Sequence, residues 1–302
     1  MRCEVQDNLS VIPDVHIGNL PLLAENDPRC DTVVIPVRLC NLPPFYPVAS
    51  RLLALSSDPS VDTARVTSIA GADPAMAAEV LFLANSSLFG FPSRIRTLAH
   101  AVALLGMDRI KALAVTVAVR AMSQGGSAPV QRCWQHSVAT AAISSKLSAT
   151  FGCSENAAYT AGLLHDIGRL GLLKQLPREC AALDSYYTDG DASLQAERVA
   201  LNIDHRTAGS YLAEHWTLPE SFGEICEHHH DPIRKRDPEL LQTVKLACRM
   251  ATVLGFSAVR FLTTDTFADL LGSLPGHLST VPFPSAEELR DHVEEALKIL
   301  GQ

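Results

Sequence analysis

The sequence predicts an all-α fold, a two-lobed helical bundle. Ala and Leu are abundant and aromatic residues make up only 6% of the chain, which favours helices over sheets. Helix-start signals recur along most of the sequence, and no segment shows the alternation of apolar and polar residues that a half-buried strand requires. The chain has 302 residues, 47% of them hydrophobic and 19% charged, so it can bury a substantial core as one or two domains.

Residues 1–38 form an N-terminal extension to which we assign no function. Four prolines interrupt it, so a helix longer than two turns does not fit comfortably. Within this extension, the run Val33-Val34-Ile35 fits one short strand.

A first helical lobe is predicted over residues 39–124. Asp58-Pro59 and Asp73-Pro74 each place a capping oxygen before a proline, which suits the first helical position because its missing N–H would have no partner there. After the second pair, apolar residues recur at helical spacing up to Asn85-Ser86-Ser87, where we expect the helix to end and the chain to turn. Further start and stop signals follow at Thr97, which opens a helix, Gly106, which closes it, and Asp108, which caps the next.

A second, larger helical lobe is predicted over residues 130–275. The stretch Ser123 to Pro129 contains paired glycines and a proline between two strongly helical flanks, and it marks the boundary between the lobes. Residues 276–302 form a C-terminal segment that ends in an amphipathic helix. Its apolar side is formed by Leu289, Val293, Ala296 and Leu297.

Composition and charge narrow the setting in which the protein works. No apolar run approaches the ~20 residues that span a bilayer, and Glu4 and Asp7 stand where a signal peptide would be basic and then apolar, so we expect a cytoplasmic protein with no membrane partner. The eight cysteines show no CxxC pairing and need not be bridged in a reducing compartment. A net charge of −8 argues against a nucleic-acid partner.

Histidines are concentrated in the second lobe. A buried imidazole without a partner costs free energy, so several histidines on facing helices indicate a shared site. Within this set, His165-Asp166 is flanked by Gly162 and Gly168, which we expect to leave room for a metal against the helix. Imidazole nitrogen and carboxylate oxygen suit Zn, Mn or Fe. The six histidines between Cys133 and Pro232 are His136, His165, His205, His228, His229 and His230.

Together, the segments WQH, AGLLHDIGRL and EHHHDP resemble the HD superfamily of metal-dependent phosphohydrolases. Two earlier blocks, NLPPFYPVASRLLALSSDPS and ADPAMAAEVLFLANSSLFGFPSRIRTLAHAVALLGMDRIKAL, make the chain similar to the HDOD family. This family is the HD-related output domain of bacterial signalling proteins, and it is related to the HD-GYP type. The resemblance covers about Leu39 to Leu271 and includes the block from Glu197 to His205. It implies an HD-type second lobe.

The resemblance also implies a set of metal ligands, with one departure. His136, His165 and Asp166 match the HD-type ligands, and relatives with expanded sites add histidines that match His205, His229 and His230. Relatives with an intact site close it with Asp, where this chain has Cys248, a possible substitute ligand. Arg169 stands where active HD-GYP enzymes tend to have Lys, which makes it a possible phosphate contact.

Two functions therefore remain open. The first is a signal-transduction output module with little or no catalysis, acting through a signalling protein partner or a small ligand, and Cys248 favours it. The second is a metal-dependent phosphohydrolase acting on a nucleotide or cyclic dinucleotide, in which the metal activates water. We assign no functional role to the other candidate residues. His228 is expected at the end of a helix, and Arg234 to Arg236 in a solvated loop. The remaining histidines are expected to be surface or interface residues: His100, His215, His277 and His292.

Overall fold

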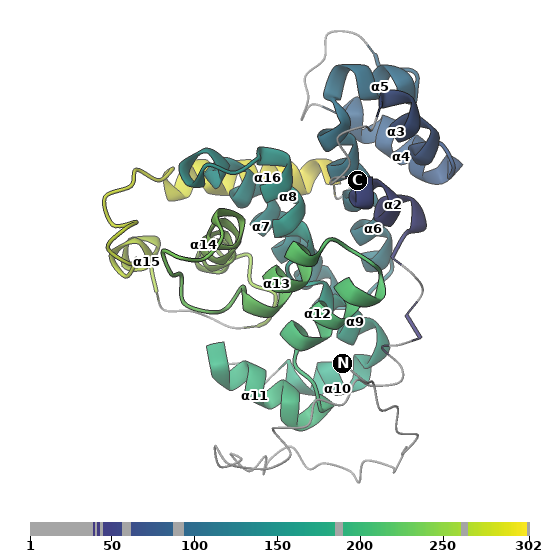
Figure 1. The fold of residues 1–302 in the computed structure, drawn as a ribbon. Helices are drawn as coiled ribbons and strands as arrows, with labels where there is room; N and C mark the ends of the chain where they lie inside the picture. Colours follow the sequence, from purple (N-terminus) through teal and green to yellow (C-terminus); the bar gives the residue numbers. More distant parts are fainter. Residues whose placement is uncertain are drawn as a thin grey trace.

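The structure is a computed structural model, and the part of it that we describe is helical throughout (Figure 1). No strand occurs in these described residues, which confirms the predicted fold class. The run Val33-Val34-Ile35 and the Asp58-Pro59 helix start lie outside them. The described residues are 39, 41–42, 45–55, 62–86, 94–184, 190–260 and 265–300.

Four short helices surround the longer helix α6 in the first part of the chain. The predicted caps at two of them are confirmed: Asp73 accepts from the backbone N–H groups of Ala75 and Met76, and Thr97 accepts from that of His100. The prediction that Asp108 caps α6 is wrong, because the cap is Gly106, two residues earlier, and Asp108 lies in the first turn of the helix. These helices are α2 (Pro47–Ala54), α3 (Thr63–Ala70), α4 (Pro74–Ala84), α5 (Leu98–Leu105) and α6 (Met107–Ser123).

The chain breaks between α6 and α7 (Ala128–Phe151), within the stretch where the lobe boundary was predicted. Helix α6 packs both on the helices before it and on α7 and α8 (Glu155–Leu164), so it belongs to both groups of helices. A division into two lobes at this break therefore stays a prediction. Helix α7 is the longest described helix, with 24 residues, and it packs against α8 and α14.

The remaining helices cover α7 and α8 and carry most of the candidate site. The predicted C-terminal amphipathic helix is present as α16, which packs on α7 (Figure 1). It buries Leu289, Val293 and Ala296 as predicted, whereas Leu297 is only half-buried. These helices are α9 (Ile167–Gln175), α10 (Pro177–Leu183), α11 (Gly190–Leu201), α12 (His205–His215), α13 (Glu220–His228), α14 (Glu239–Val253), α15 (Phe267–Gly272) and α16 (Ala286–Leu300).

Among the described residues, no single helix is long and apolar enough to cross a membrane. Helices α3 and α4 pass the length and composition test only as a pair, and they are bent by 115° relative to each other.

Candidate metal centre

His136 and His165 face each other across the α7–α8 packing. His136 lies in the middle of α7, and His165 is the residue at which α8 ends. The Nδ1 of His136 is 2.7 Å from the carbonyl oxygen of Phe256, and the Nδ1 of His165 is 2.6 Å from that of Gly162. A carbonyl oxygen can only accept, so each Nδ1 carries the hydrogen and each Nε2 keeps a free lone pair. The two Nε2 atoms are 3.2 Å apart.

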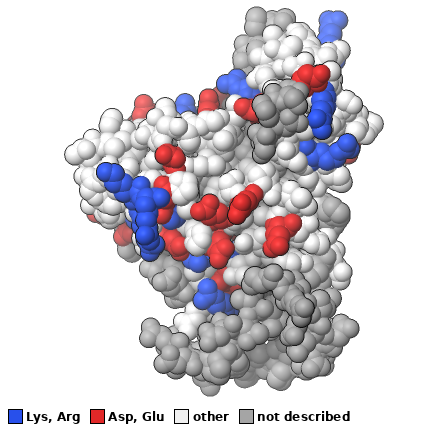
Figure 2. Space-filling view, in the orientation of Figure 1, with Lys and Arg blue, Asp and Glu red and all other residues white. Residues whose placement is uncertain are grey.

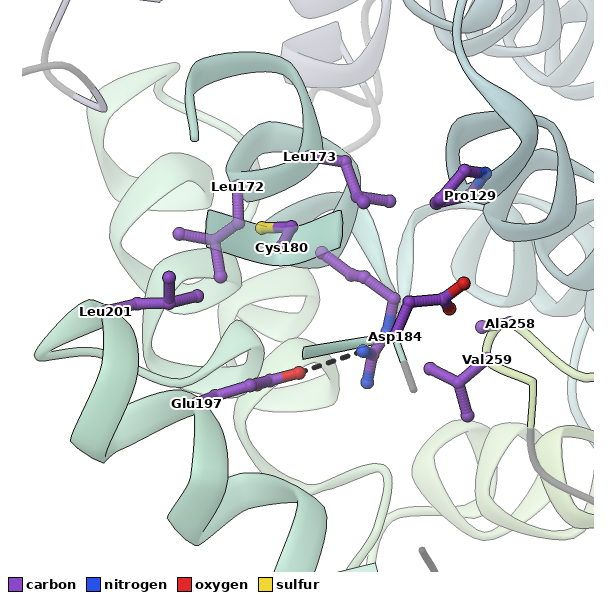
Figure 3. Close-up of a pocket in the computed structure, with 10 residues that line it drawn as sticks. Pro129, Leu172, Leu173, Cys180, Asp184, Glu197, Leu201, Ala258 and Val259 are labelled. Carbon is purple, nitrogen blue, oxygen red and sulfur yellow. Dashed lines mark hydrogen bonds and ion pairs between the residues drawn. The ribbon is translucent and has the colours of Figure 1, made fainter. Parts of the chain in front are cut away.

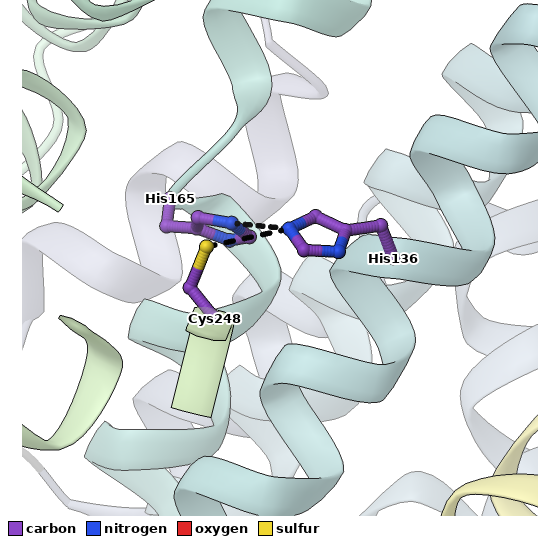
Figure 4. Close-up of side chains that lie close together, drawn as sticks. All are labelled: His136, His165 and Cys248. Carbon is purple, nitrogen blue, oxygen red and sulfur yellow. Dashed lines mark hydrogen bonds between the residues drawn. The ribbon is translucent and has the colours of Figure 1, made fainter. Parts of the chain in front are cut away.

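Cys248 is the third residue whose side chain lies beside these two Nε2 atoms. It projects from α14, and its Sγ lies 3.5 Å from the Nε2 of His136 (Figure 4). Burial, and after it the negative charge of Asp166, raises the pKa of the Cys248 thiol to about 12, so without a cation the thiol donates to His136. The Nε2 atoms of His136 and His165 and the Sγ of Cys248 lie within 4.8 Å of one another, and we call them the His-Cys group.

His205, His229 and His230 form a second set of convergent nitrogens, the three-histidine group, whose candidate ligand atoms also lie within 4.8 Å of one another. The Nδ1 of His229 donates to the carbonyl oxygen of Cys226, and its Nε2 is buried without a hydrogen bond. Whereas His205 and His229 are buried, His230 is exposed. The rings of His165 and His229 are 4.9 Å apart, so the two groups adjoin.

Arg169 is the centre of a buried ionic network beside the three-histidine group. Its Nε donates to Oδ2 of Asp166 at 3.0 Å, and its Nη1 donates to Oε1 of Glu197 at 2.8 Å. The Nη2 of Arg169 lies 2.8 Å from the Nδ1 of His205 and 3.2 Å from its Nε2. The second oxygen of Asp166, Oδ1, is buried without a hydrogen bond. One guanidinium is thus shared between two carboxylates.

Glu197 is a site residue that sequence reasoning missed, since it was named only as the start of a matched block. Its Oε2 accepts from both the backbone N–H and the Nδ1 of His205, at 2.8 and 2.7 Å. Burial raises the pKa of Glu197, but His205 and Arg169 outweigh burial and lower it to about 2. Burial and then His136 lower the pKa of His165 to about 3. At neutral pH the site therefore combines an ionised carboxylate with a neutral imidazole.

Arg169 also lines a small, mostly apolar pocket (Figure 3). Its free space is about that of one water molecule. Arg132 contacts Asp184, on the wall of the pocket, at 2.5 Å. The lining residues are Pro129, Arg169, Leu172, Leu173, Cys180, Asp184, Glu197, Leu201, Ala258 and Val259.

The glycines beside His165-Asp166 have a different role from the predicted one. A Cβ on Gly168 would lie 2.0 Å from the carbonyl oxygen of His205 and 2.3 Å from the nitrogen of Gly209. A Cβ on Gly162 would lie 2.8 Å from the Cα of Ala141 in α7. These glycines therefore allow α9 to approach α12 and α8 to approach α7, which brings the histidines together, and the expectation that they leave room for a metal is wrong.

The other residues singled out in the sequence lie outside the two histidine groups. His228, at the end of α13, bonds Asp231 through Nδ1 at 2.9 Å. Arg234, Lys235 and Arg236 are exposed, as expected for a solvated loop. Lysines and arginines form one cluster at the left edge of the visible face and further groups at its upper right, while acidic side chains occupy its middle (Figure 2). Asn85 ends α4 and bonds the backbone of Ile95 in both directions, which confirms a structural role.

All six predicted ligand residues therefore come together with Arg169 and Cys248, and their metal-binding role stays a prediction. The donor set fits a divalent metal: lone pairs of two imidazoles and a sulfur converge in the His-Cys group, and Asp166 and His229 each hold a buried polar atom without a hydrogen bond.

An all-helical fold with this histidine pocket defines an HD-type protein. The chain belongs to the HDOD family: the family model of the HDOD domain matches residues 42–232. A protein of Treponema pallidum (strain Nichols), described as uncharacterized, is 24% identical over 196 residues. That match covers 60% of this chain and 37% of the relative, so this chain matches well under half of the relative's length.

Solved structures share the fold. An HDOD domain protein of unknown function from Geobacter sulfurreducens is 23% identical with a TM-score of 0.68, covering 86% of this chain and 91% of that one. A structure from Shewanella amazonensis named "Putative phosphohydrolase" is 21% identical with a TM-score of 0.65, covering 88% and 94%. A "Putative signal transduction protein" from Marinobacter aquaeolei is 21% identical with a TM-score of 0.63, covering 91% and 64%.

Proposed function

We propose that this chain is a bacterial signal-transduction module that acts by binding a protein partner or a small ligand and has little or no phosphohydrolase activity. The observation that carries this proposal is the position of Arg169. A hydrolytic metal centre needs carboxylates that are free to hold the metal and orient its water. Here the Arg169 guanidinium is bonded to Asp166 and Glu197 at 3.0 and 2.8 Å, deep in the protein.

Two further features support the proposal. Where relatives with an intact site have a carboxylate, Cys248 offers a thiol whose pKa is raised by burial, which changes the charge of the site. The five described cysteines are all free thiols, which suits a reducing cytoplasm.

A metal-dependent phosphohydrolase is the second candidate. It is favoured by the buried Oδ1 of Asp166 and Nε2 of His229, neither of which has a hydrogen bond. In that function His136, His165 and Asp166 would hold a metal, assisted by the three-histidine group, and the metal would supply an activated water. Arg169 would then serve as the phosphate contact. This role requires its guanidinium to leave at least one of the two carboxylates that now bind it.

The comparison of wild type with Cys248→Asp tests the proposal. Both proteins are loaded with Mn²⁺ or Fe²⁺ and assayed on bis-phenyl phosphate esters and on cyclic dinucleotides. We expect near-background hydrolysis by the wild type, because the carboxylate that would close the site is missing, and at most a gain in affinity for these metals in the variant. Robust wild-type hydrolysis that disappears in His165→Ala or Asp166→Ala would contradict the proposal and favour the metal-dependent phosphohydrolase instead.

A further inference from the structure

We propose that this chain binds a single thiophilic metal ion of the Zn²⁺ class on the Nε2 atoms of His136 and His165 and the Sγ of Cys248, and that Arg169 takes the place of a second cation. The inference deepens the proposed function, because it names the chemical class of ligand that the pocket would bind. On binding, the ion replaces the thiol proton of Cys248, which leaves to solvent, so a sulfur–metal bond forms as the S–H bond breaks.

The first argument is the direction of the lone pairs. Backbone carbonyls fix the hydrogen of His136 and of His165 on Nδ1, so both Nε2 lone pairs point into the same space, with the nitrogens 3.2 Å apart. Two lone pairs this close repel each other unless a proton or a cation lies between them. The structure offers one proton for this space, that of the Cys248 thiol, 3.5 Å from His136. A cation bound to all three atoms would satisfy all of them at once.

The second argument is the class of donor. Two imidazole nitrogens and one thiolate favour zinc and other thiophilic ions, whereas carboxylates and water favour Mg²⁺ and Mn²⁺. Asp166 does not join the atoms that converge on this point: one of its oxygens is bonded to Arg169 and the other lies 3.9 Å from the Nε2 of His205. Cys248 is therefore the anionic ligand of the His-Cys group.

The third argument concerns the number of ions. The three-histidine group also gathers candidate ligand atoms, but the Nη2 of Arg169 lies within 3.2 Å of both ring nitrogens of His205. A metal on His205 would meet the positive guanidinium at short range, in surroundings that screen charge poorly. Arg169 already bonds Asp166 and Glu197, the carboxylates that a second metal would need.

The test uses the full chain, stripped of metal and reloaded with Co²⁺ as a spectroscopic substitute for Zn²⁺. We expect a sulfur-to-cobalt charge-transfer band in wild type, its loss in Cys248→Ser and Cys248→Asp, and its retention in Cys153→Ser. Cys153 is the matched control because its sulfur contacts Ser148 and Thr243, outside both histidine groups. Elemental analysis of Zn²⁺-loaded wild type should give about one ion per chain, and Zn²⁺ affinity should fall at least about tenfold in Cys248→Ser.

A measurement on the wild type keeps the test valid if a variant fails to fold. X-ray absorption at the zinc edge of Zn²⁺-loaded wild type should show one sulfur ligand at about 2.3 Å together with imidazole nitrogens. A Co²⁺ complex without the sulfur band, a zinc edge without a sulfur ligand, or two tightly bound ions per chain would each overturn the inference. If the sulfur-to-cobalt band is missing and no hydrolysis is seen, the metal inference fails but the proposed signalling function stands. If the band is present and hydrolysis is strong, the proposed signalling function fails but the metal inference stands.

Discussion

Replacing Arg169 with Met should be among the most damaging changes in the second half of the chain. The substitution keeps much of the aliphatic stem but removes the positive charge that two carboxylates share, whose side chains are only 3% (Asp166) and 1% (Glu197) exposed. Removing one partner of a buried ion pair costs about 3–5 kcal/mol. Because two carboxylates lose their partner, we expect the upper end, about 5 kcal/mol. At about 2–4 °C per kcal/mol, the melting temperature should fall by about 10–20 °C.

The assay is thermal unfolding of purified wild type, Arg169→Met and Arg290→Met at pH 7, followed by circular dichroism. Arg290 is the matched control because it lies exposed on α16, where the same substitution should change stability by about 0.5 kcal/mol or less. If Arg169→Met yields no folded protein while the control does, the loss of stability exceeds about 5 kcal/mol but has the same cause. A melting temperature for Arg169→Met within about 3 °C of wild type would refute the claim that the ion pairs of Arg169 stabilise the fold.

Three other perturbations give separate expectations. Because burial and His136 lower the pKa of His165 to about 3 in the folded state, the unfolded chain takes up a proton first, and urea titrations should show stability falling as the pH drops from about 6.5 towards 3. Glu197, whose folded pKa is about 2, should add a loss below about pH 4.5 that Glu197→Gln does not show. Gly168→Ala should lower both stability and metal content, because its Cβ meets the backbone of α12, whereas a Cβ on Gly272 has open space and Gly272→Ala should match wild type. Zn²⁺ at about 100 times its Kd should stabilise wild type by about 2.7 kcal/mol, read as a rise in melting temperature that Cys248→Ser lacks.

Much of the fold could be predicted because its signals are local. Asp73-Pro74 and Thr97 set helix starts through hydrogen bonds to residues only two or three positions away, and the structure keeps both. The Asp108 prediction failed by two positions, since Gly106 is both the residue that ends α5 and the cap that starts α6.

The site was only partly predictable because it depends on contacts between distant segments. The histidines share a matched set of motifs, so their convergence followed from the family resemblance. The link between Arg169 and Glu197 joins residues 28 positions apart, and nothing in the spacing states which acidic residue meets a given arginine. The same holds for Cys248 and His136, which are 112 positions apart. The close approach at Gly168 likewise becomes visible only when α9 and α12 are packed.

The most direct test of the central claim is turnover per bound metal ion in wild type. Metal content and hydrolysis of bis-phenyl phosphate esters and cyclic dinucleotides are measured on the same samples, loaded in turn with Zn²⁺, Mn²⁺ and Fe²⁺, so that missing metal cannot be mistaken for missing activity. Our account predicts bound metal with hydrolysis at the level of the His165→Ala variant. Hydrolysis that rises in proportion to bound metal and disappears in His165→Ala would contradict it.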